Sequence, residues 1–123
     1  MANINRDYIV KLFLAEDGAN RGKINVPVPI SFYTSDRRTQ NIFLVADTVI
    51  DDLTVELLFA TDGQEHRVIG TRLDNKTVLF DLDYQDLQAP GTYQATILLA
   101  KDDEVLTSQI FTFTVKANLL GGE

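Results

Sequence analysis

The sequence predicts an all-β domain, a sandwich of two antiparallel sheets with about seven to eight strands. Three observations predict this fold. Apolar residues recur at every second position in most runs, which is the period of a half-buried strand. Turn-forming residues separate these runs at intervals of about 10 to 20 residues. Only residues 83–87 have a pattern that suits a helical turn.

Four runs alternate most cleanly, at 53–60, 78–83, 92–100 and 111–116. In such runs one face lies on a core and the other faces water. The side chains expected to be largely buried are Leu57, Phe59, Val78, Phe80, Tyr93, Ile97, Phe111 and Phe113.

Three further runs predict strands less distinctly. Residues 8–14 are apolar on both faces, and 42–46 follow a polar stretch. Residues 24–32 carry one apolar row, but Pro27 and Pro29 lie on the opposite face. Since proline cannot donate a ladder hydrogen bond, this run is expected to be an edge strand or an extended linker.

The residues between the runs suit antiparallel connections. Asp62-Gly63 predicts a hairpin between 53–60 and a strand near 65–72. Asp74-Asn75 separates that strand from the next. The segment from Leu87 to Ala95 resembles the corner of immunoglobulin-like sandwiches, where a tyrosine hydroxyl bonds back to nearby backbone, and the expected sandwich is therefore immunoglobulin-like. Tyr93 would be that tyrosine, or alternatively an ordinary strand aromatic.

The length of the chain predicts the number of domains, and its charge predicts which partners are not expected. A chain of 123 residues suits one domain, expected at 1–117, with 118–123 as the start of a linker or the end of the piece. The net charge is −7, and the 11 basic residues are scattered among 18 acidic ones. Nucleic-acid binding and anionic-membrane binding need clustered basic residues, so neither is expected. No apolar run is long enough for a signal peptide or a membrane span.

No residue set predicts catalysis, a metal site or a cofactor site. The single histidine, His66, follows the Asp62-Gly63 turn and is expected to be a solvated strand residue. There are no cysteines, and no nucleophile-elbow, zinc-helix or phosphate-loop motif occurs. The acidic groups Asp51-Asp52, Asp81 with Asp83, and 102–104 could offer oxygen ligands, but acids in turns are usually solvated. We expect no enzyme.

The candidate interface lies in residues 8–14. If Tyr8, Val10 and Leu12 face the core, Ile9 and Phe13 point the other way. They would meet either another protein surface or a covering loop formed by residues 15–25.

The order of several motifs resembles the N-terminal domain family of phage baseplate upper proteins. Along nearly the whole chain these motifs are Tyr8-Ile-Val-Lys11-Leu-Phe-Leu, Phe32-Tyr33-Thr34-Ser35-Asp36 followed by Ile42-Phe-Leu, 57–63, Pro90-Gly91-Thr-Tyr93, and Ser108-Gln-Ile-Phe-Thr-Phe113-Thr-Val115 with Asn118-Leu-Leu.

The resemblance implies a structural protein of the tail baseplate of phages and prophages of Gram-positive bacteria. Its N-terminal domain would attach the protein to other baseplate proteins. Later regions, absent from this sequence, would form a homotrimer and hold the receptor-binding protein. The protein would be assembled in the bacterial cytoplasm and lie in the virion. The alternative from the residues alone is a carbohydrate-binding β-sandwich module, which would require exposed aromatic side chains.

Overall fold

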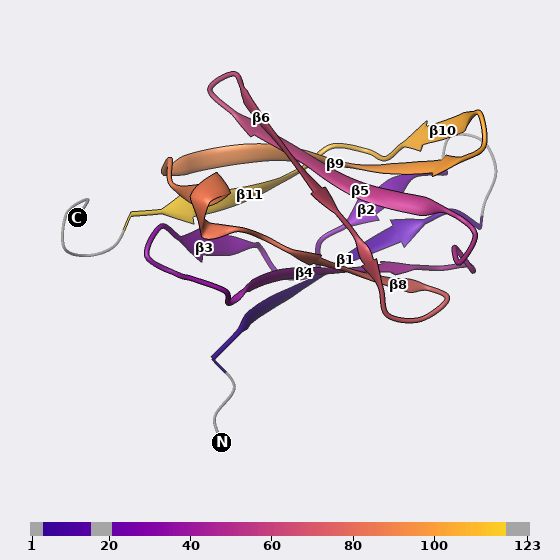
Figure 1. Cartoon of the computed structure of the whole chain (residues 1–123), viewed down its shortest axis with the longest axis horizontal. Helices are drawn as coiled ribbons and strands as arrows, with labels where there is room; N and C mark the ends of the chain where they lie inside the picture. The colour runs from indigo at the N-terminus through magenta and orange to yellow at the C-terminus, as the bar shows by residue number, and fades with distance from the viewer. Residues whose placement is uncertain (1–3, 16–20, 118–123) are drawn as a thin grey trace.

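The computed structural model describes residues 4–15 and 21–117, and in this part of the chain eleven strands pack as two sheets (Figure 1). Sheet A has the order β2-β1-β4-β8-β7, with β2 at Lys23–Asn25, β1 at Arg6–Phe13, β4 at Gln40–Ala46, β8 at Thr77–Asp81 and β7 at Thr71–Arg72. Sheet B has the order β3-β11-β9-β5-β6, with β3 at Ser31–Tyr33, β11 at Phe111–Lys116, β9 at Gly91–Lys101, β5 at Thr54–Thr61 and β6 at Gln64–Ile69. A further strand, β10 at Glu104–Thr107, pairs with β9.

The predicted β-sandwich is confirmed, but the sheets are mixed rather than antiparallel throughout. β1 pairs in parallel with β4, and β3 pairs in parallel with β11. Parallel neighbours need a crossover connection, and the chain between β1 and β4 makes one by passing through β3 in the other sheet. The turn-forming residues between the expected strands do not show that the chain crosses from one sheet to the other between β1 and β4.

The strand number is also higher than expected, because two expected strands each divide in two and β10 forms an additional strand before β11. The run near 65–72 ends as β6 in sheet B and restarts as β7 in sheet A, with Gly70 between them. A Cβ atom on Gly70 would collide with the Val78 side chain and lie 3.0 Å from the Val55 carbonyl oxygen. Only glycine leaves room for the chain to cross between the sheets here.

The proline-containing run behaves as a linker flanked by two edge strands. β2 and β3 are the edges of their sheets, and 26–30 connects them without forming a strand. Val28 is exposed in this connection, whereas Ile30 and Phe32 return to the core. The expected single apolar row is therefore interrupted at Val28.

The core lies between the sheets, and all eight side chains expected there are buried. Its centre is aromatic: the Phe113 ring lies 5.1 Å from Tyr93, 5.5 Å from Phe59 and 5.8 Å from Phe32 between centroids. Two local predictions are confirmed as well. Asp62 and Gly63 adopt positive φ angles of 48° and 78° in the β5–β6 turn, and a 3₁₀ helix, η2, spans Tyr84–Leu87.

Candidate functional site

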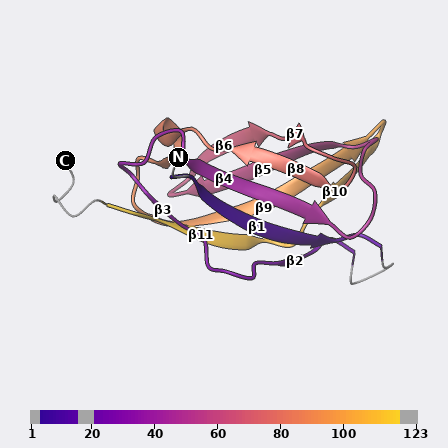
Figure 2. The same cartoon turned by 90° about the horizontal axis from the view of Figure 1, so that it is seen from below.

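The outer face of sheet A carries a row of apolar side chains, although this face is directed away from the core. In Figure 2, β1 and β4 lie in front of β9, so this face is turned toward the viewer. Ile9 on β1 is paired with Phe43 on β4, which is paired in turn with Leu79 on β8. The three side chains form one row across three strands. Ile9 is 49% exposed, and Phe43 and Leu79 are partly exposed.

Two more rows flank the apolar one. Toward the start of β1, Asp7, Asn41 and Asp81 occupy successive strands, and the Asn41 amide donates a hydrogen bond of 2.9 Å to Asp7. Toward its end, Lys11 is paired with Val45. Phe13 follows two residues later and is 39% exposed.

The predicted orientation of Ile9 and Phe13 agrees with the structure, since Val10 and Leu12 are fully buried between them. The proposed covering segment does not behave as one unit. Its end, Lys23–Asn25, pairs beside β1 as strand β2, and residues 16–20 lie outside the described part of the chain. A role of Ile9 and Phe13 as an interface stays a prediction.

Polar contacts fix the position of β1 at both ends. The Tyr8 hydroxyl donates to the Ser31 carbonyl at 2.8 Å, and Arg6 pairs with Asp36 at 2.6 Å. That hydrogen bond to Asp36 raises the pKa of Arg6 above its ordinary value. At the other end, the Asp47 carboxylate accepts from the backbone N–H of Leu14 at 2.7 Å. These contacts tie both ends of β1 to neighbouring segments of the fold.

Tyr93 makes the bond predicted for a tyrosine corner. Its hydroxyl donates to the Ala89 carbonyl at 2.8 Å, while its ring stacks on Phe113 with an interplanar angle of 9°. Burial raises the pKa of the Tyr93 hydroxyl. This tyrosine is a structural residue that closes the corner before β9.

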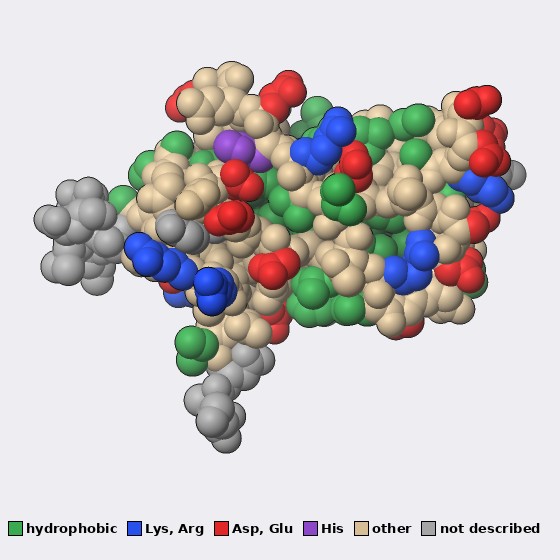
Figure 3. All heavy atoms as spheres, in the orientation of Figure 1, with side chains coloured by type: hydrophobic (Ala, Val, Ile, Leu, Met, Phe, Trp, Pro, Cys, Tyr) green, Lys and Arg blue, Asp and Glu red, His purple; other side chains and the backbone are tan. Residues whose placement is uncertain are grey.

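The expectation of a solvated His66 is wrong. Its side chain is only 23% exposed, stacks on Phe59 at 5.2 Å, and places Nδ1 3.2 Å from an Asp86 carboxylate oxygen on η2. His66 lies at the edge of the sandwich on the core side of β6, where the ring covers Phe59. The histidine therefore joins two elements of the fold, and Figure 3 shows it near acidic side chains.

The acidic groups have separate structural contacts. Asp52 pairs with Lys101 at 2.7 Å, and this ammonium group lowers the pKa of Asp52. Asp83 caps η2 by accepting from the Gln85 N–H at 3.0 Å. Within residues 4–15 and 21–117, no group of three or more His, Asp or Glu side chains is placed to hold a metal ion. No helix in the same residues is long and apolar enough to span a bilayer.

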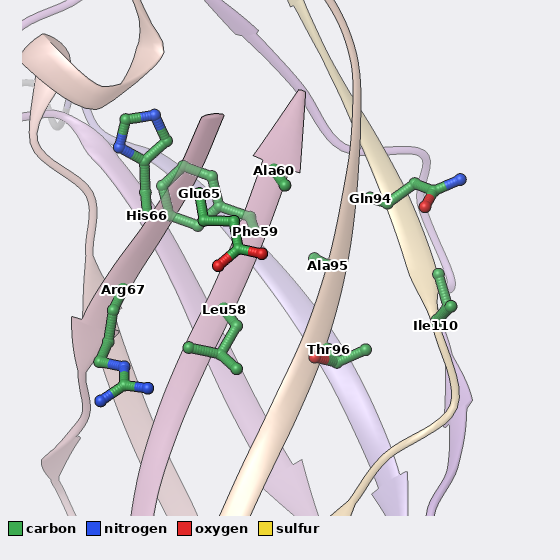
Figure 4. Close-up of a pocket in the computed structure, with 10 residues that line it drawn as sticks. All are labelled: Leu58, Phe59, Ala60, Glu65, His66, Arg67, Gln94, Ala95, Thr96 and Ile110. Atoms are coloured by element: carbon green, nitrogen blue, oxygen red, sulfur yellow. The ribbon is translucent and has the colours of Figure 1, made fainter. Parts of the chain in front are cut away.

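A shallow hollow of about 410 Å³ lies on the outer face of sheet B. Leu58 and Ala60 form its floor, Glu65 and Arg67 one side, and Ile110 lies on the other (Figure 4). His66 also lines the hollow, with its ring across β6 from the Glu65 carboxylate. We find no nucleophile and base within contact of each other among these side chains.

The aromatic residues bear on the carbohydrate-binding alternative, which requires exposed rings. Most described rings are in the core, namely Phe32, Phe59, Phe80, Tyr93, Phe111 and Phe113. Phe13 is the exposed exception among the described rings. The described side chains thus do not form an aromatic platform.

Sequence reasoning missed two members of the apolar row, Phe43 and Leu79. The alternation in 78–83 correctly predicted that Leu79 points away from the core. Its neighbours on the outer face of sheet A depend on strand order, which the alternation does not give. The available signal was that β4 has apolar residues at adjacent positions, Ile42 to Val45, as β1 does.

The fold and this surface define the chain as a β-sandwich domain with an exposed apolar row on the outer face of one sheet. No family model matches the chain, and no curated protein matches it in sequence. Among solved structures, the N-terminal domain of phage TP901-1 ORF48 is similar in fold, with a TM-score of 0.61 and 16% identity. That alignment covers 89% of this chain and 98% of the other. A Bacteroides vulgatus protein described as a glycoside hydrolase aligns with a TM-score of 0.47 and 15% identity, over 72% of this chain and 16% of its own.

Proposed function

We propose that this chain is a structural module of a phage tail baseplate, an N-terminal domain that attaches its protein to the baseplate core. The observation that carries the proposal is the correspondence of fold with the phage ORF48 domain, which extends over nearly all of both chains. The order of sequence motifs that resembles baseplate upper proteins supports it independently. Fold alone does not assign a function, so the proposal also needs a contact surface.

The contact surface in this proposal is the outer face of sheet A. Exposed apolar rows on one rigid face are typical of protein–protein contact sites. The role is non-enzymatic, and the protein would lie in the virion after assembly in the bacterial cytoplasm. Later regions of a longer protein would supply trimerisation and the attachment of a receptor-binding protein.

Replacing Ile9 and Phe13 together by Asp tests the surface. Both side chains are exposed, so the double variant should fold, and its far-UV circular dichroism should match the wild type. We expect it to be strongly depleted from purified tails of the phage that encodes it, because two buried charges without partners oppose association. Quantitative mass spectrometry of the tails measures the incorporation.

The matched control replaces Gln94 and Thr112 by Asp, since these exposed residues are paired on the outer face of sheet B. The control should incorporate normally. Normal incorporation of the folded Ile9 and Phe13 variant would exclude this face, and absence of the wild-type protein from the tails would refute the proposed function itself.

A further inference from the structure

The outer face of sheet A changes its chemistry in one direction along the strands. Asp7 and Ile9 and Lys11 follow one another at every second position of β1. Asp81, near the Asp7 end, adds a second acid, and Lys23, paired with Phe13 on β2, adds a second base at the other end. The apolar row lies between an acidic and a basic end.

This arrangement is balanced in charge, although the whole chain has a net charge of −7. Asp7 and Lys11 are each two residues from Ile9, and therefore about 6.6 Å from it on opposite sides. A surface with opposite charges equally spaced about an apolar centre is complementary to a copy of itself turned by half a turn.

We infer that this face packs against the same face of a second copy of the chain, about a two-fold axis that runs across the strands through the Ile9, Phe43 and Leu79 row. This axis places Lys11 of each copy opposite Asp7 of the other. The inference rests on the contact surface assigned under the proposed function, and it names a second copy of the chain, rather than another baseplate protein, as the occupant of that surface.

The alternative two-fold axis, along the strands, is disfavoured by charge. If this axis lay along β4, β1 of one copy would face β8 of the other, with the residue pairs of the sheet still aligned. Asp7 of one copy would then face Asp81 of the other. Like charges facing each other in an interface oppose the association. The axis across the strands instead sets the Asp81 carboxylate opposite the Thr77 hydroxyl, which can donate to it.

The size of the face fits a weak association. The five strands of sheet A have 25 residues, and at about 3.3 Å per residue and about 4.8 Å between strands they present a projected area of about 400 Å². Specific interfaces bury about 800 Å² per partner, and weaker ones less. We therefore expect a weak dimer, with a Kd on the order of 100 μM.

Sedimentation velocity of the full chain tests the inference with three charge variants. Asp7→Lys and Lys11→Asp alone should each weaken self-association by about tenfold or more, because each places like charges opposite each other. The double variant, Asp7→Lys with Lys11→Asp, should restore association close to the wild-type level. An equimolar mixture of the two single variants should also associate, since their faces are then opposite in charge.

Both substituted residues, Asp7 and Lys11, are at exposed positions, and circular dichroism should confirm that each variant folds. A wild-type chain that stays monomeric to about 1 mM would overturn the inference, as would single variants that associate normally or a double variant that fails to recover. If the wild type is monomeric but the Ile9 and Phe13 variant is lost from tails, the face binds a different protein and the proposed function stands. If the charge variants associate as expected but the wild-type protein is absent from tails, the inference stands and the proposed function fails.

Discussion

At the residue scale, Tyr93 shows how one side chain serves both the core and a loop. Its ring is buried against Phe113 and its hydroxyl reaches the Ala89 carbonyl. A buried hydroxyl that has a partner stabilises the fold modestly, by about 1 kcal/mol. Its geometry also fixes where the chain turns into β9.

Tyr93→Phe should lower the free energy of unfolding by about 1 kcal/mol, because the ring packing is kept and one hydrogen bond is lost. Urea denaturation measures this change. Tyr33→Phe, at the partly exposed end of β3, is the control and should change stability by less than about 0.5 kcal/mol. Equal stability of Tyr93→Phe and wild type would show that the hydroxyl bond contributes nothing.

The stability of the domain should also fall in alkaline solution. Burial raises the pKa of Tyr93 above the ordinary value of 10.0, so the folded state keeps its proton where the unfolded state has lost it. The contribution of Tyr93 is therefore complete below pH 10 and decreases as the pH rises through the folded-state pKa. The loss of unfolding free energy above pH 10 should be smaller in Tyr93→Phe, and an identical alkaline slope would contradict this assignment.

At the element scale, the crossing at Gly70 links the two sheets. The chain leaves β6 and enters β7 within a single residue, and the Gly70 N–H donates to the Val55 carbonyl at 2.9 Å. The Val78 side chain fills the space beside it. The bend is therefore determined by close packing, which a side chain at this position would disturb.

Gly70→Ala should destabilise the domain by about 1–3 kcal/mol, the usual cost of an extra methyl group in a full core. Thr71→Ala, at the exposed neighbouring residue, should stay within about 0.5 kcal/mol of wild type. Thermal unfolding compares the two. If Gly70→Ala matched its control, the sheets would have enough freedom at this crossing to absorb a methyl group.

At the scale of the whole molecule, pairings between distant segments dominate the fold. β1 pairs with β4, β3 pairs with β11, and β5 pairs with β9, so the sheets close only when remote parts of the chain meet. Such topologies lose much chain entropy before they gain contacts. The single core connects all of these pairings.

Refolding after urea dilution should accordingly take milliseconds to seconds, as in other domains with many long-range strand pairings. Stopped-flow tyrosine fluorescence measures the rate, and a helical bundle of similar length provides a faster reference. A main phase in the microsecond range would mean that local contacts govern folding.

The sequence by itself determined the local properties of this protein. The period of two identified the strands and the buried rows, since alternation depends only on the geometry of an extended chain. Asp62-Gly63 specified its turn, and residues 83–87 specified their helical turn, because the conformational preferences of these residues are local. The outward direction of Ile9 and Phe13 followed from the same alternation.

Only the tertiary structure decided which strands and side chains are neighbours in space. The parallel pairings, the crossing at Gly70 and the contact of His66 with Phe59 and Asp86 join residues whose spacing along the chain carries no period. For the same reason, Phe43 and Leu79 became part of one surface with Ile9 only when β1, β4 and β8 were placed side by side. Strand order depends on the free energy of the whole packed core, which no local pattern encodes.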